Sequence, residues 1–581
     1  MRKVTERNFR THDGVELFYR HWPAASARPT QAIVLFHRGH EHSGRLQHIV
    51  DELNLPDHAM FAWDARGHGR SPGERGDSPS FAASVKDVDA FLRHVSREHD
   101  IPSENIAVVA QSVGAVLVAT WAHDYAPRVR CMVLAAPAFK VKLYIPFARA
   151  GMKLMYRLRG NFFVNSYVKA KFLTHDPERI RSYETDPLIT RAISARILLA
   201  LYEAGERVVA DAQAIRLPVQ LLLSGADWVV HLGPQHEFFE RLGSTTKEKH
   251  VLPGFYHDTL GEKDRAAALS KARDFILRMF TQPAHRQPLL DADRSGYTKE
   301  EMDRLARPLA PFSPKSLVFS LLRLSMRTLG RLSEGVRLGL ATGFDSGSTL
   351  DYVYRNRASG ALGVGRLIDR NYLDSIGWRG IRVRKQHLGQ AIASAAGRLR
   401  AAGQPVRIAD IAAGHGRYVL EALDGLQARP ESILLRDYSD LNVREGGALI
   451  DAKGLSGIAR FVKGDAFDEE SVARIEPRPS LAIVSGLYEL FPDNAQVLAS
   501  LRGLGRAVAP GGYLIYTGQP WHPQLELIAR TLTSHRGHQA WVMRRRTQAE
   551  MDDLARHAGF EKLEQWTDDW GIFTVSLAAR V

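Results

Sequence analysis

Ser112 lies in a sequence that favours a reactive hydroxyl group. An apolar run, Ile106–Ala110, is expected to form a strand, and the residues QSVG lead from it into an apolar helical segment. Small residues two before and two after a serine permit the sharp strand-to-helix turn that exposes a nucleophile. Because a hydroxyl is a poor nucleophile at neutral pH, it needs a histidine base that a carboxylate orients.

Candidates for both partners follow later in the chain. Asp227 comes directly after the predicted strand VQLLLSGA, and His257 follows HVLPGFY. Enzymes with this turn place first the acid and then the histidine after later strands. The chemistry also needs two backbone N–H donors for an oxyanion. We expect one from Val113 and the other from the loop HRGH, residues 37–40. An ordinary turn serine is the weaker interpretation.

Five segments, FHRGHEHSGR, WDARGHGRSPGERG, AQSVG, LLLSGADWVV and PGFYHDTLGEKDR, together resemble the monoacylglycerol lipase and lysophospholipase branch of the α/β hydrolases, also grouped with the serine aminopeptidases. The resemblance covers about residues 8–279. It implies that Ser112 is the nucleophile, Asp227 the orienting acid and His257 the base. It further implies that Gly39 and Val113 form the oxyanion hole and that a lipid or lysolipid ester is the substrate. The same triad can cleave amides, so peptidase activity stays open.

The loop of residues 37–42 is rich in histidine. Arg38 and His40 stand where the resembled family usually has glycines, and His37, His40 and His42 raise the alternative of a metal site. Serine-triad chemistry requires no metal, and histidines in such a loop more often pack or form local hydrogen bonds. We therefore predict no metal.

Residues 139–188 interrupt the alternation of strands and helices where the resembled family inserts a helical lid. Between Tyr125 and His175 there are ten Lys or Arg residues and no Asp or Glu, with apolar side chains among them. A surface that is both apolar and basic could rest on anionic lipid. An ordinary cap over an acyl pocket would have a similar composition, so both interpretations stay open.

A second chemical motif begins at Asp410. The sequence VRIADIAAGHGRYVLEAL indicates a strand, a turn and a helix, in which Gly414 and Gly416 let the backbone approach a ligand closely. Asp437 ends the next predicted strand, where a carboxylate can accept hydrogen bonds from ribose hydroxyls. Asp465 follows a third strand. This order favours a site for a nucleotide-type cofactor.

The progression resembles the class I S-adenosylmethionine-dependent methyltransferases over about residues 351–581, with Ala412 at the first glycine of their D-x-G-x-G-x-G turn. The implied cofactor is S-adenosyl-L-methionine. The positions that the resemblance assigns to it are Asp410, Ala412, Gly414 and Gly416 for the methionine part, Asp437 for the ribose, and Asp465 and Ala466 for the adenine. An NAD-binding domain is the less favoured alternative, because the G-x-G-x-x-G phosphate fingerprint is absent.

Tyr488 and Glu489 follow the fourth predicted strand of this half and are best placed to face a methyl acceptor. Methyl transfer needs mainly alignment, and a general base helps some acceptors. Aromatic residues also close cofactor pockets by packing, so a structural role for Tyr488 is as favoured as a catalytic one. The acceptor itself stays unknown.

Parallel sheets must position both sets of residues. Each half alternates short apolar runs with helical patterns, which is typical of βαβ units. The strands predicted in the first half are Ala32–Phe36, Met60–Trp63, Ile106–Ala110, Cys131–Ala135, Val219–Ser224 and His250–Leu252. Those of the second are Arg407–Ile411, Ser432–Arg436, Ala459–Val462, Leu481–Ser485 and Gly512–Thr517, followed by a terminal hairpin. The predicted fold class is α/β, an α/β-hydrolase domain with a helical lid followed by a Rossmann-like class I methyltransferase domain.

The predicted boundaries are residues 1–281 for the first domain and 349–581 for the second. The linker, residues 282–348, begins with a stretch rich in Pro, Gly and Asp. Leu317–Leu340 is predicted to be helical, with arginine at every fourth residue from 323 to 331. Such a basic amphipathic helix could lie on anionic lipid. We favour a helix that packs its leucines on a neighbouring domain.

The composition fits this organisation. A chain of 581 residues with 45% hydrophobic and 24% charged residues is long enough for several domains and is neither disordered nor fibrous. Its net charge of +14 suits an anionic partner. No nucleic-acid-binding motif accompanies the charge, so we expect no nucleic acid.

Cys131 is the single cysteine, which excludes an internal disulfide and fits a reducing compartment. The N-terminus lacks the apolar stretch of a signal peptide, and no apolar run of about 18 residues is present. These features predict a cytoplasmic protein, and they leave open a peripheral contact with the inner face of an anionic membrane.

Together the two motifs predict a bifunctional enzyme, a serine ester hydrolase fused to a methyltransferase. In one alternative the second domain binds S-adenosylmethionine without catalysis or acts as a scaffold, because Ala412 replaces a glycine. A membrane-surface adaptor is the least favoured alternative, since the triad is complete in the sequence.

Overall fold

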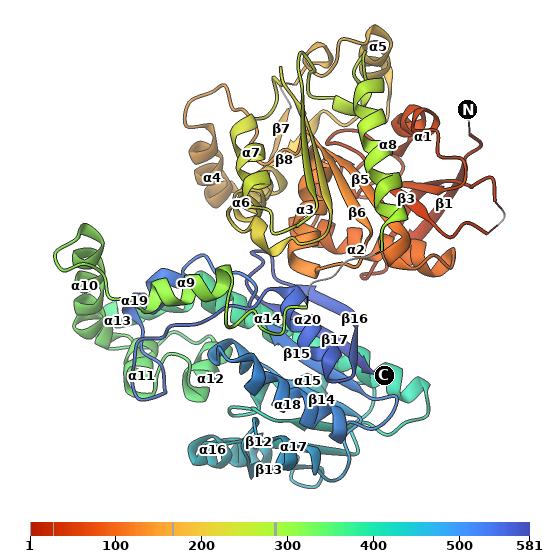
Figure 1. The fold of residues 1–581 in the computed structure, drawn as a ribbon. Helices are drawn as coiled ribbons and strands as arrows, with labels where there is room; N and C mark the ends of the chain where they lie inside the picture. Colours follow the sequence, from red (N-terminus) through yellow and green to blue (C-terminus); the bar gives the residue numbers. More distant parts are fainter. Residues whose placement is uncertain (1, 27, 166–167, 284–287) are drawn as a thin grey trace. The chain divides into compact units, whose positions relative to one another are not determined.

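The computed structural model describes residues 2–26, 28–165, 168–283 and 288–581. Contacts divide the chain into two compact units, residues 1–286 and 287–581. Figure 1 shows that each unit has its own sheet with helices packed around it. The α/β fold class is therefore confirmed for both halves.

The first unit is built on an eight-stranded sheet in the order β1-β2-β4-β3-β5-β6-β9-β10. Six neighbouring strands are parallel and lie where strands were predicted: β4 (Ala59–Trp63), β3 (Ala32–Phe36), β5 (Ile106–Gln111), β6 (Cys131–Ala135), β9 (Val219–Ser224) and β10 (Lys247–Leu252). The antiparallel pair β1 (Thr5–Arg10) and β2 (Glu16–Trp22), which was not predicted, extends one edge.

Helices cover both faces of this sheet. One face packs against α1 (Gln47–Leu53) and α8 (Ala266–Thr281). The other packs against α2 (Phe81–Glu98), α3 (Val113–Tyr125), α6 (Ala195–Ala210) and α7 (Leu232–Arg241). The central strands are buried on both faces, and for that reason their sequences are continuous apolar runs.

Between β6 and α6 the chain leaves the sheet. This segment contains α4 (Ala148–Arg159), β7 (Phe163–Asn165), the 3-10 helix η3 (Ala170–Phe172), α5 (Pro177–Thr185) and β8 (Ala192–Ser194). β7 and β8 pair with each other in a small antiparallel sheet. No residue of α4 is buried, so the helix covers the unit without contributing to its core.

The second unit has a seven-stranded sheet in the order β13-β12-β11-β14-β15-β17-β16. Its first five strands are parallel: β13 (Ala459–Lys463), β12 (Ser432–Asp437), β11 (Arg407–Asp410), β14 (Leu481–Val484) and β15 (Tyr513–Gly518). The predicted terminal hairpin is β16 (Phe560–Thr567) with β17 (Thr574–Arg580), and β17 pairs antiparallel with β15.

Helices again cover both faces of the sheet. α14 (Ile376–Ala401), α15 (Arg417–Ala422) and α16 (Asp440–Ala452) contribute to one core. α17 (Glu469–Ala473), α18 (Asn494–Ala507) and α20 (Gln548–His557) contribute to the other. A third core holds the remaining helices, among them α11 (Glu334–Thr342), α12 (Gly347–Arg355), α13 (Val364–Leu373) and α19 (Leu525–Thr531).

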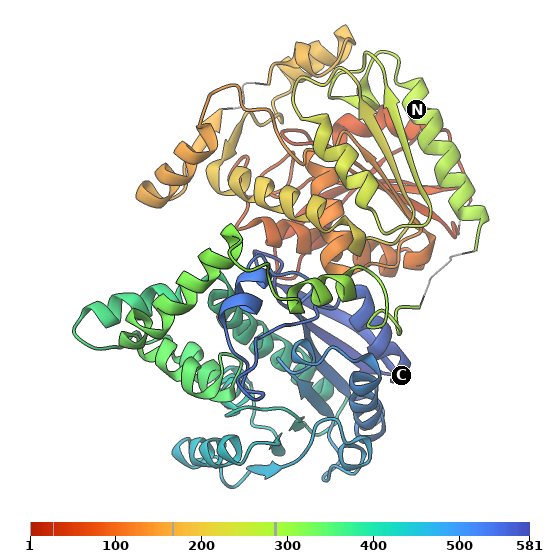
Figure 2. The ribbon, with the colours of Figure 1, turned by 60° about the vertical axis from the view of Figure 1, so that its left-hand side comes forward.

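The single helix predicted over Leu317–Leu340 is wrong in its continuity. The segment forms α10 (Pro314–Arg327), the 3-10 helix η6 (Leu329–Leu332) and α11, which Figures 1 and 2 place together at one edge of the second unit. Thr328 leaves the helical conformation, and the Ser333 hydroxyl accepts a hydrogen bond from the Val336 N–H as the N-cap of α11. Serine is favoured at the N-cap, where a helix begins, and is less favoured in the interior of a helix.

Among the described residues, no helix is long and apolar enough to span a bilayer.

Candidate functional site

Ser112 lies at a strained turn between β5 and α3. Its φ of +56° and ψ of −118° belong to a region that residues other than glycine rarely adopt. Its backbone N–H donates to the carbonyl of Ala135 at 2.9 Å, which ties the turn to β6. Gly114 is required by close packing, because a Cβ atom there would lie 2.4 Å from the carbonyl oxygen of His37.

The structure brings the three candidate triad side chains into one hydrogen-bonded line. The Ser112 Oγ lies 2.7 Å from Nε2 of His257, and Nδ1 of His257 lies 2.8 Å from Oδ2 of Asp227. All three residues are buried. They come from the ends of β5, β9 and β10, which lie at the same edge of the parallel part of the sheet.

Backbone groups hold the Asp227 carboxylate in its charged form. Its Oδ1 accepts hydrogen bonds from the N–H groups of Val229 and Val230, at 2.7 and 3.0 Å. Burial by itself raises the pKa of Asp227, but His257 and these two donors outweigh it and lower the pKa below its ordinary value. A charged carboxylate on Nδ1 keeps Nε2 free to accept a proton from Ser112.

The candidate oxyanion donors are also neighbours. A Cβ atom on Gly39 would lie 3.0 Å from Cγ2 of Val113, so the loop after β3 comes close to the beginning of α3. The first N–H groups of a helix lack intrahelical partners, and the N–H of Val113 is one of them.

Arg38, where the resembled family has glycine, belongs to a buried network of charges that the sequence did not predict. Its guanidinium lies 2.7 Å from Oε1 of Glu41 and 3.7 Å from Oδ2 of Asp258. Glu41 also binds Arg45, and Asp258 also binds Arg179. The Glu41 that follows Arg38 by three residues was the sequence signal for this pairing.

Two histidines of this loop form hydrogen bonds with other protein groups. Nδ1 of His37 lies 2.8 Å from the Arg38 carbonyl, and its Nε2 accepts from the Ala65 N–H at 3.1 Å. Nε2 of His42 lies 2.9 Å from Asp186. Both rings are thus held by protein groups.

A cavity of about 670 Å³ lies over Ser112 and His257. Its lining is mainly apolar and includes Leu117, Leu201 and Val229 from the body of the unit. Ile145, Met152 and Met155 line it from the segment between β6 and α6. The cavity has the size and character of a site for an acyl chain.

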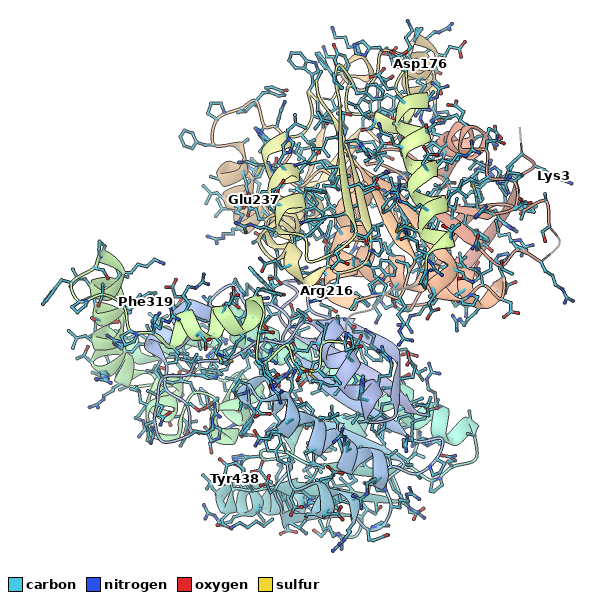
Figure 3. The ribbon with its side chains drawn as sticks, viewed as in Figure 1. Lys3, Asp176, Arg216, Glu237, Phe319 and Tyr438 are labelled. Atoms are coloured by element: carbon cyan, nitrogen blue, oxygen red, sulfur yellow. The ribbon has the colours of Figure 1, made fainter. Side chains whose placement is uncertain are left out.

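A second site lies at the carboxyl ends of β11, β12 and β14, in a cavity of about 640 Å³. Six of the seven predicted cofactor residues line it: Ala412, Gly414, Gly416, Asp437, Asp465 and Ala466. Tyr438, labelled in Figure 3 at the end of β12, and Phe467 line it as well. Gly414 and Gly416 both have positive φ, +57° and +72°, which bends the turn beneath the cavity.

Asp437 organises this cavity. Its Oδ2 accepts from the Gly414 N–H at 3.0 Å, and its Oδ1 accepts from the Ser439 N–H and the Asn442 amide, both at 3.0 Å. A carboxylate has about four acceptor positions, so Oδ2 can accept a further hydrogen bond. The hydroxyl of Ser485 also lines the cavity and is buried without a hydrogen-bond partner among the described residues. These groups fit a polar ligand with ribose hydroxyls.

Asp410, the seventh residue, is not among those that line the cavity. It is wholly buried beneath the turn, where its Oδ2 accepts from the Tyr418 hydroxyl at 2.5 Å. Burial raises the pKa of Asp410 to about 7, against the opposing effect of this hydrogen bond. In this structure the carboxyl supports the turn from below.

Tyr488 and Glu489 have different surroundings. Tyr488 is buried, its hydroxyl lies 2.9 Å from Oγ of Ser500, and it does not line the cavity at Asp437. Glu489 lines a neighbouring cavity of about 480 Å³, and its Oε1 accepts from the Thr517 hydroxyl at 3.0 Å.

Comparison with known proteins finds separate matches for the two parts of the chain. Residues 27–264 match the family model described as "Serine aminopeptidase, S33", and residues 272–580 match the one described as "Putative methyltransferase". Monoacylglycerol lipase from Mycolicibacterium smegmatis is 26% identical over 47% of this chain and 97% of its own length. Human monoglyceride lipase is 28% identical over 42% of this chain and 80% of its own length.

A solved monoacylglycerol lipase from Paleococcus ferrophilus matches 48% of this chain and 99% of its own, at 23% identity and a TM-score of 0.41. The Escherichia coli (strain K12) protein named Uncharacterized protein YnbC is 57% identical over 99% of this chain and 98% of its own length.

The fold and the matches define a lipase-like serine hydrolase domain, followed by an α/β region that matches the family model described as "Putative methyltransferase". The chain belongs to the family whose model is described as "Putative methyltransferase", and to the same family as the Escherichia coli relative along its whole matched length.

Proposed function

We propose that this protein is a bifunctional enzyme, a serine hydrolase of lipid esters joined to an S-adenosylmethionine-dependent methyltransferase. The observation that carries the first activity is the unbroken line from Ser112 through His257 to Asp227. Relatives named monoacylglycerol lipase and monoglyceride lipase support a lipid ester as the substrate. The apolar cavity over Ser112 supports an acyl chain as the part bound there.

In the proposed hydrolase mechanism, Nε2 of His257 takes the hydroxyl proton as Oγ of Ser112 attacks the ester carbonyl carbon. Asp227 stabilises the imidazolium that forms, and the N–H groups of Gly39 and Val113 stabilise the oxyanion. His257 then gives its proton to the leaving alcohol. Water, activated by the same histidine, releases the fatty acid from Ser112.

Ser112→Ala is expected to lower the hydrolysis of 1-monooleoylglycerol by about a thousandfold or more, because it removes the nucleophile. Release of fatty acid by the full-length protein is the measurement. S-adenosylmethionine affinity serves as the control and should not change, since Ser112 lies in the other unit. Retained turnover in the variant would refute the triad.

For the second unit we propose that the cavity at Asp437 holds S-adenosylmethionine. Asp437 would bind the ribose, the turn containing Ala412, Gly414 and Gly416 the methionine part, and Asp465 and Ala466 the adenine. Asp410 would act indirectly, by supporting that turn. When bound, this cofactor supplies a methyl group on a sulfonium sulfur that leaves as a neutral thioether. The lining residues and the unpartnered Ser485 hydroxyl support the proposal.

Isothermal titration of the full-length protein with S-adenosylmethionine tests this assignment. We expect micromolar binding that Asp437→Ala weakens about tenfold or more, because hydrogen bonds to a charged group are lost. Asp440→Ala is the matched control, an exposed aspartate three residues along that does not line the cavity. Absence of binding by the wild-type protein would refute the cofactor site. Binding without methyl transfer to any acceptor would favour the alternative of a non-catalytic domain.

We also propose peripheral contact with an anionic membrane. In the segment between β6 and α6, Phe147 and Leu158 are 88% and 76% exposed beside several Lys and Arg residues. On α10, Leu321 and Leu324 are 67% and 58% exposed, and the exposed Arg327 makes no ion pair among the described residues. Apolar groups with cations around them suit the interface of an anionic bilayer.

A further inference from the structure

The cavity beside Glu489 adjoins the cofactor cavity of the second unit. Asp345, Leu350, Gly486 and Leu490 line both. A molecule in the second cavity would therefore lie next to whatever the first one holds. This position makes the second cavity the natural place for a reaction partner of the cofactor.

Most of its wall is apolar. The lining includes Trp378 and Ile381 from α14, Trp541 and Met543 from the segment after α19, and Phe573. The rings of Trp378 and Trp541 are stacked, with centroids 6.5 Å apart. Leu329 and Leu527 line the cavity and are also exposed, so its apolar lining continues onto the surface near α10. An apolar small molecule that fills this cavity would bury most of its surface.

Five polar atoms of the same lining residues are buried without a hydrogen-bond partner among the described residues. They are Nε of Arg384, Oε2 of Glu489, Nε2 of Gln519, Nε1 of Trp541 and the hydroxyl oxygen of Tyr372. Buried polar groups in folded proteins nearly always have partners. The three nitrogen atoms can only donate, Oε2 of Glu489 can only accept, and the Tyr372 hydroxyl can do either, so a bound group that both donates and accepts would satisfy them best.

The charged side chains of the cavity already have partners within the protein. The Asp345 carboxylate accepts from the Ser534 hydroxyl and from the His535 N–H, both at 2.6 Å. Nη1 of Arg384 lies 3.7 Å from Oε1 of Glu489, and the same Oε1 accepts from Thr517, which leaves Oε2 to a ligand. His522 also lines the cavity, and burial lowers its pKa to about 4, so its ring is neutral. A neutral ligand would enter without leaving an unpaired charge.

We infer that this cavity binds the methyl acceptor and that the acceptor is a neutral, apolar alcohol or phenol whose hydroxyl donates to Oε2 of Glu489. The inference rests on the proposed methyltransferase function, which it makes more specific. The hydroxyl oxygen forms the new bond to the methyl carbon, the electron pair of the broken C–S bond stays on sulfur, and the hydroxyl proton passes to Glu489. A neutral ether, a neutral thioether and a protonated carboxyl result.

Binding of hydroxyl probes without cofactor tests the inference. The full-length protein is titrated calorimetrically with 2-naphthol, with its methyl ether 2-methoxynaphthalene, and with 1-decanol. We expect the wild-type protein to bind both alcohols. Glu489→Gln should lower the affinity for 2-naphthol about tenfold, because a hydrogen bond to a charged acceptor is lost. The methyl ether, which has no proton to donate, should bind both proteins equally.

Each other outcome has a separate meaning. No binding of either alcohol by the wild-type protein overturns the inference, even if S-adenosylmethionine binds. If Glu489→Gln lowers the affinities for 2-naphthol and its ether equally, the inference is also overturned, because the residue then affects only the shape of the site. If the alcohols bind through Glu489 and S-adenosylmethionine does not, the binding site stands and the proposed methyl transfer fails.

Discussion

Asp410 belongs to the sequence motif of the second unit, but it is buried and does not line the cavity. Its carboxyl holds its proton up to about pH 7 in the folded protein because it is buried, whereas its ordinary pKa is 3.8. Between these two values the folded state binds more protons than the unfolded state. The free energy of unfolding therefore falls as the pH rises through this window, as far as Asp410 contributes to it.

Asp410→Asn should remove this contribution. An amide oxygen can still accept from Tyr418, but the side chain no longer releases a proton. We expect the melting temperature of the variant, relative to wild type, to be about 3 °C higher at pH 8 than at pH 5. Thermal unfolding of the full-length protein at both pH values measures this difference, with the exposed Asp440→Asn as the control. Parallel behaviour of variant and wild type would contradict it.

Arg38 makes a related point in the first unit. An arginine buried in the loop after β3 would be unfavourable alone, but Glu41 and Asp258 pair with it. Removing one partner of a buried pair leaves an uncompensated charge. Arg38 stands where the resembled family has glycine, and the two acids compensate for the burial of its charge.

Among the elements, α10 differs most from its expected role. We favoured a helix that packs its leucines on a neighbouring domain, yet several leucines of α10 are exposed. Figure 3 labels Phe319 on this helix, which is half-buried, in contrast to Leu317 and Leu321. The exposed leucines therefore form a face of α10 apart from the side that carries Phe319.

Vesicle binding tests the role of this face. We expect the full-length protein to sediment with vesicles of phosphatidylglycerol and phosphatidylcholine, and less with phosphatidylcholine alone. The double variant Leu321→Glu, Leu324→Glu should lower the affinity for the phosphatidylglycerol-containing vesicles about tenfold, since it adds negative charge and removes apolar contact. Val581→Glu, at another exposed apolar position of the same unit, is the matched control. Unchanged sedimentation with a lowered melting temperature would instead indicate that the face packs against protein.

At the scale of the whole molecule, each unit has hydrophobic cores of its own; the described residues form two in the first unit and three in the second. Units with separate cores can unfold separately. Ligand binding to one unit then stabilises that unit alone.

Calorimetric scanning of the full-length protein should therefore show two transitions. S-adenosylmethionine at about 100 times its dissociation constant should stabilise one of them by about 2.7 kcal/mol and leave the other unchanged. A lipid-ester analogue that reacts with Ser112 should raise the other transition. A single transition that both ligands shift together would show that the units unfold as one.

The sequence by itself determined the α/β class of both halves and the positions of eleven parallel strands, because strands buried on both faces are written as local apolar runs. It also determined the candidates Ser112, Asp227 and His257, since their order along the chain follows from the order of the strands. The antiparallel strands β1 and β2 at one end of the sheet escaped prediction because neither is a continuous apolar run: β1 has one buried residue, and β2 contains Glu16, Arg20 and His21.

Only the tertiary structure decided how residues far apart in the chain share a site. It separated Asp410 and Tyr488 from the cavity at Asp437 by burying them, and it placed Glu489 in a second cavity with Arg384 and Gln519. It also paired Arg38 with Asp258, 220 positions away. Burial and pairing of this kind depend on packing between elements, and local sequence patterns do not determine which elements pack against each other.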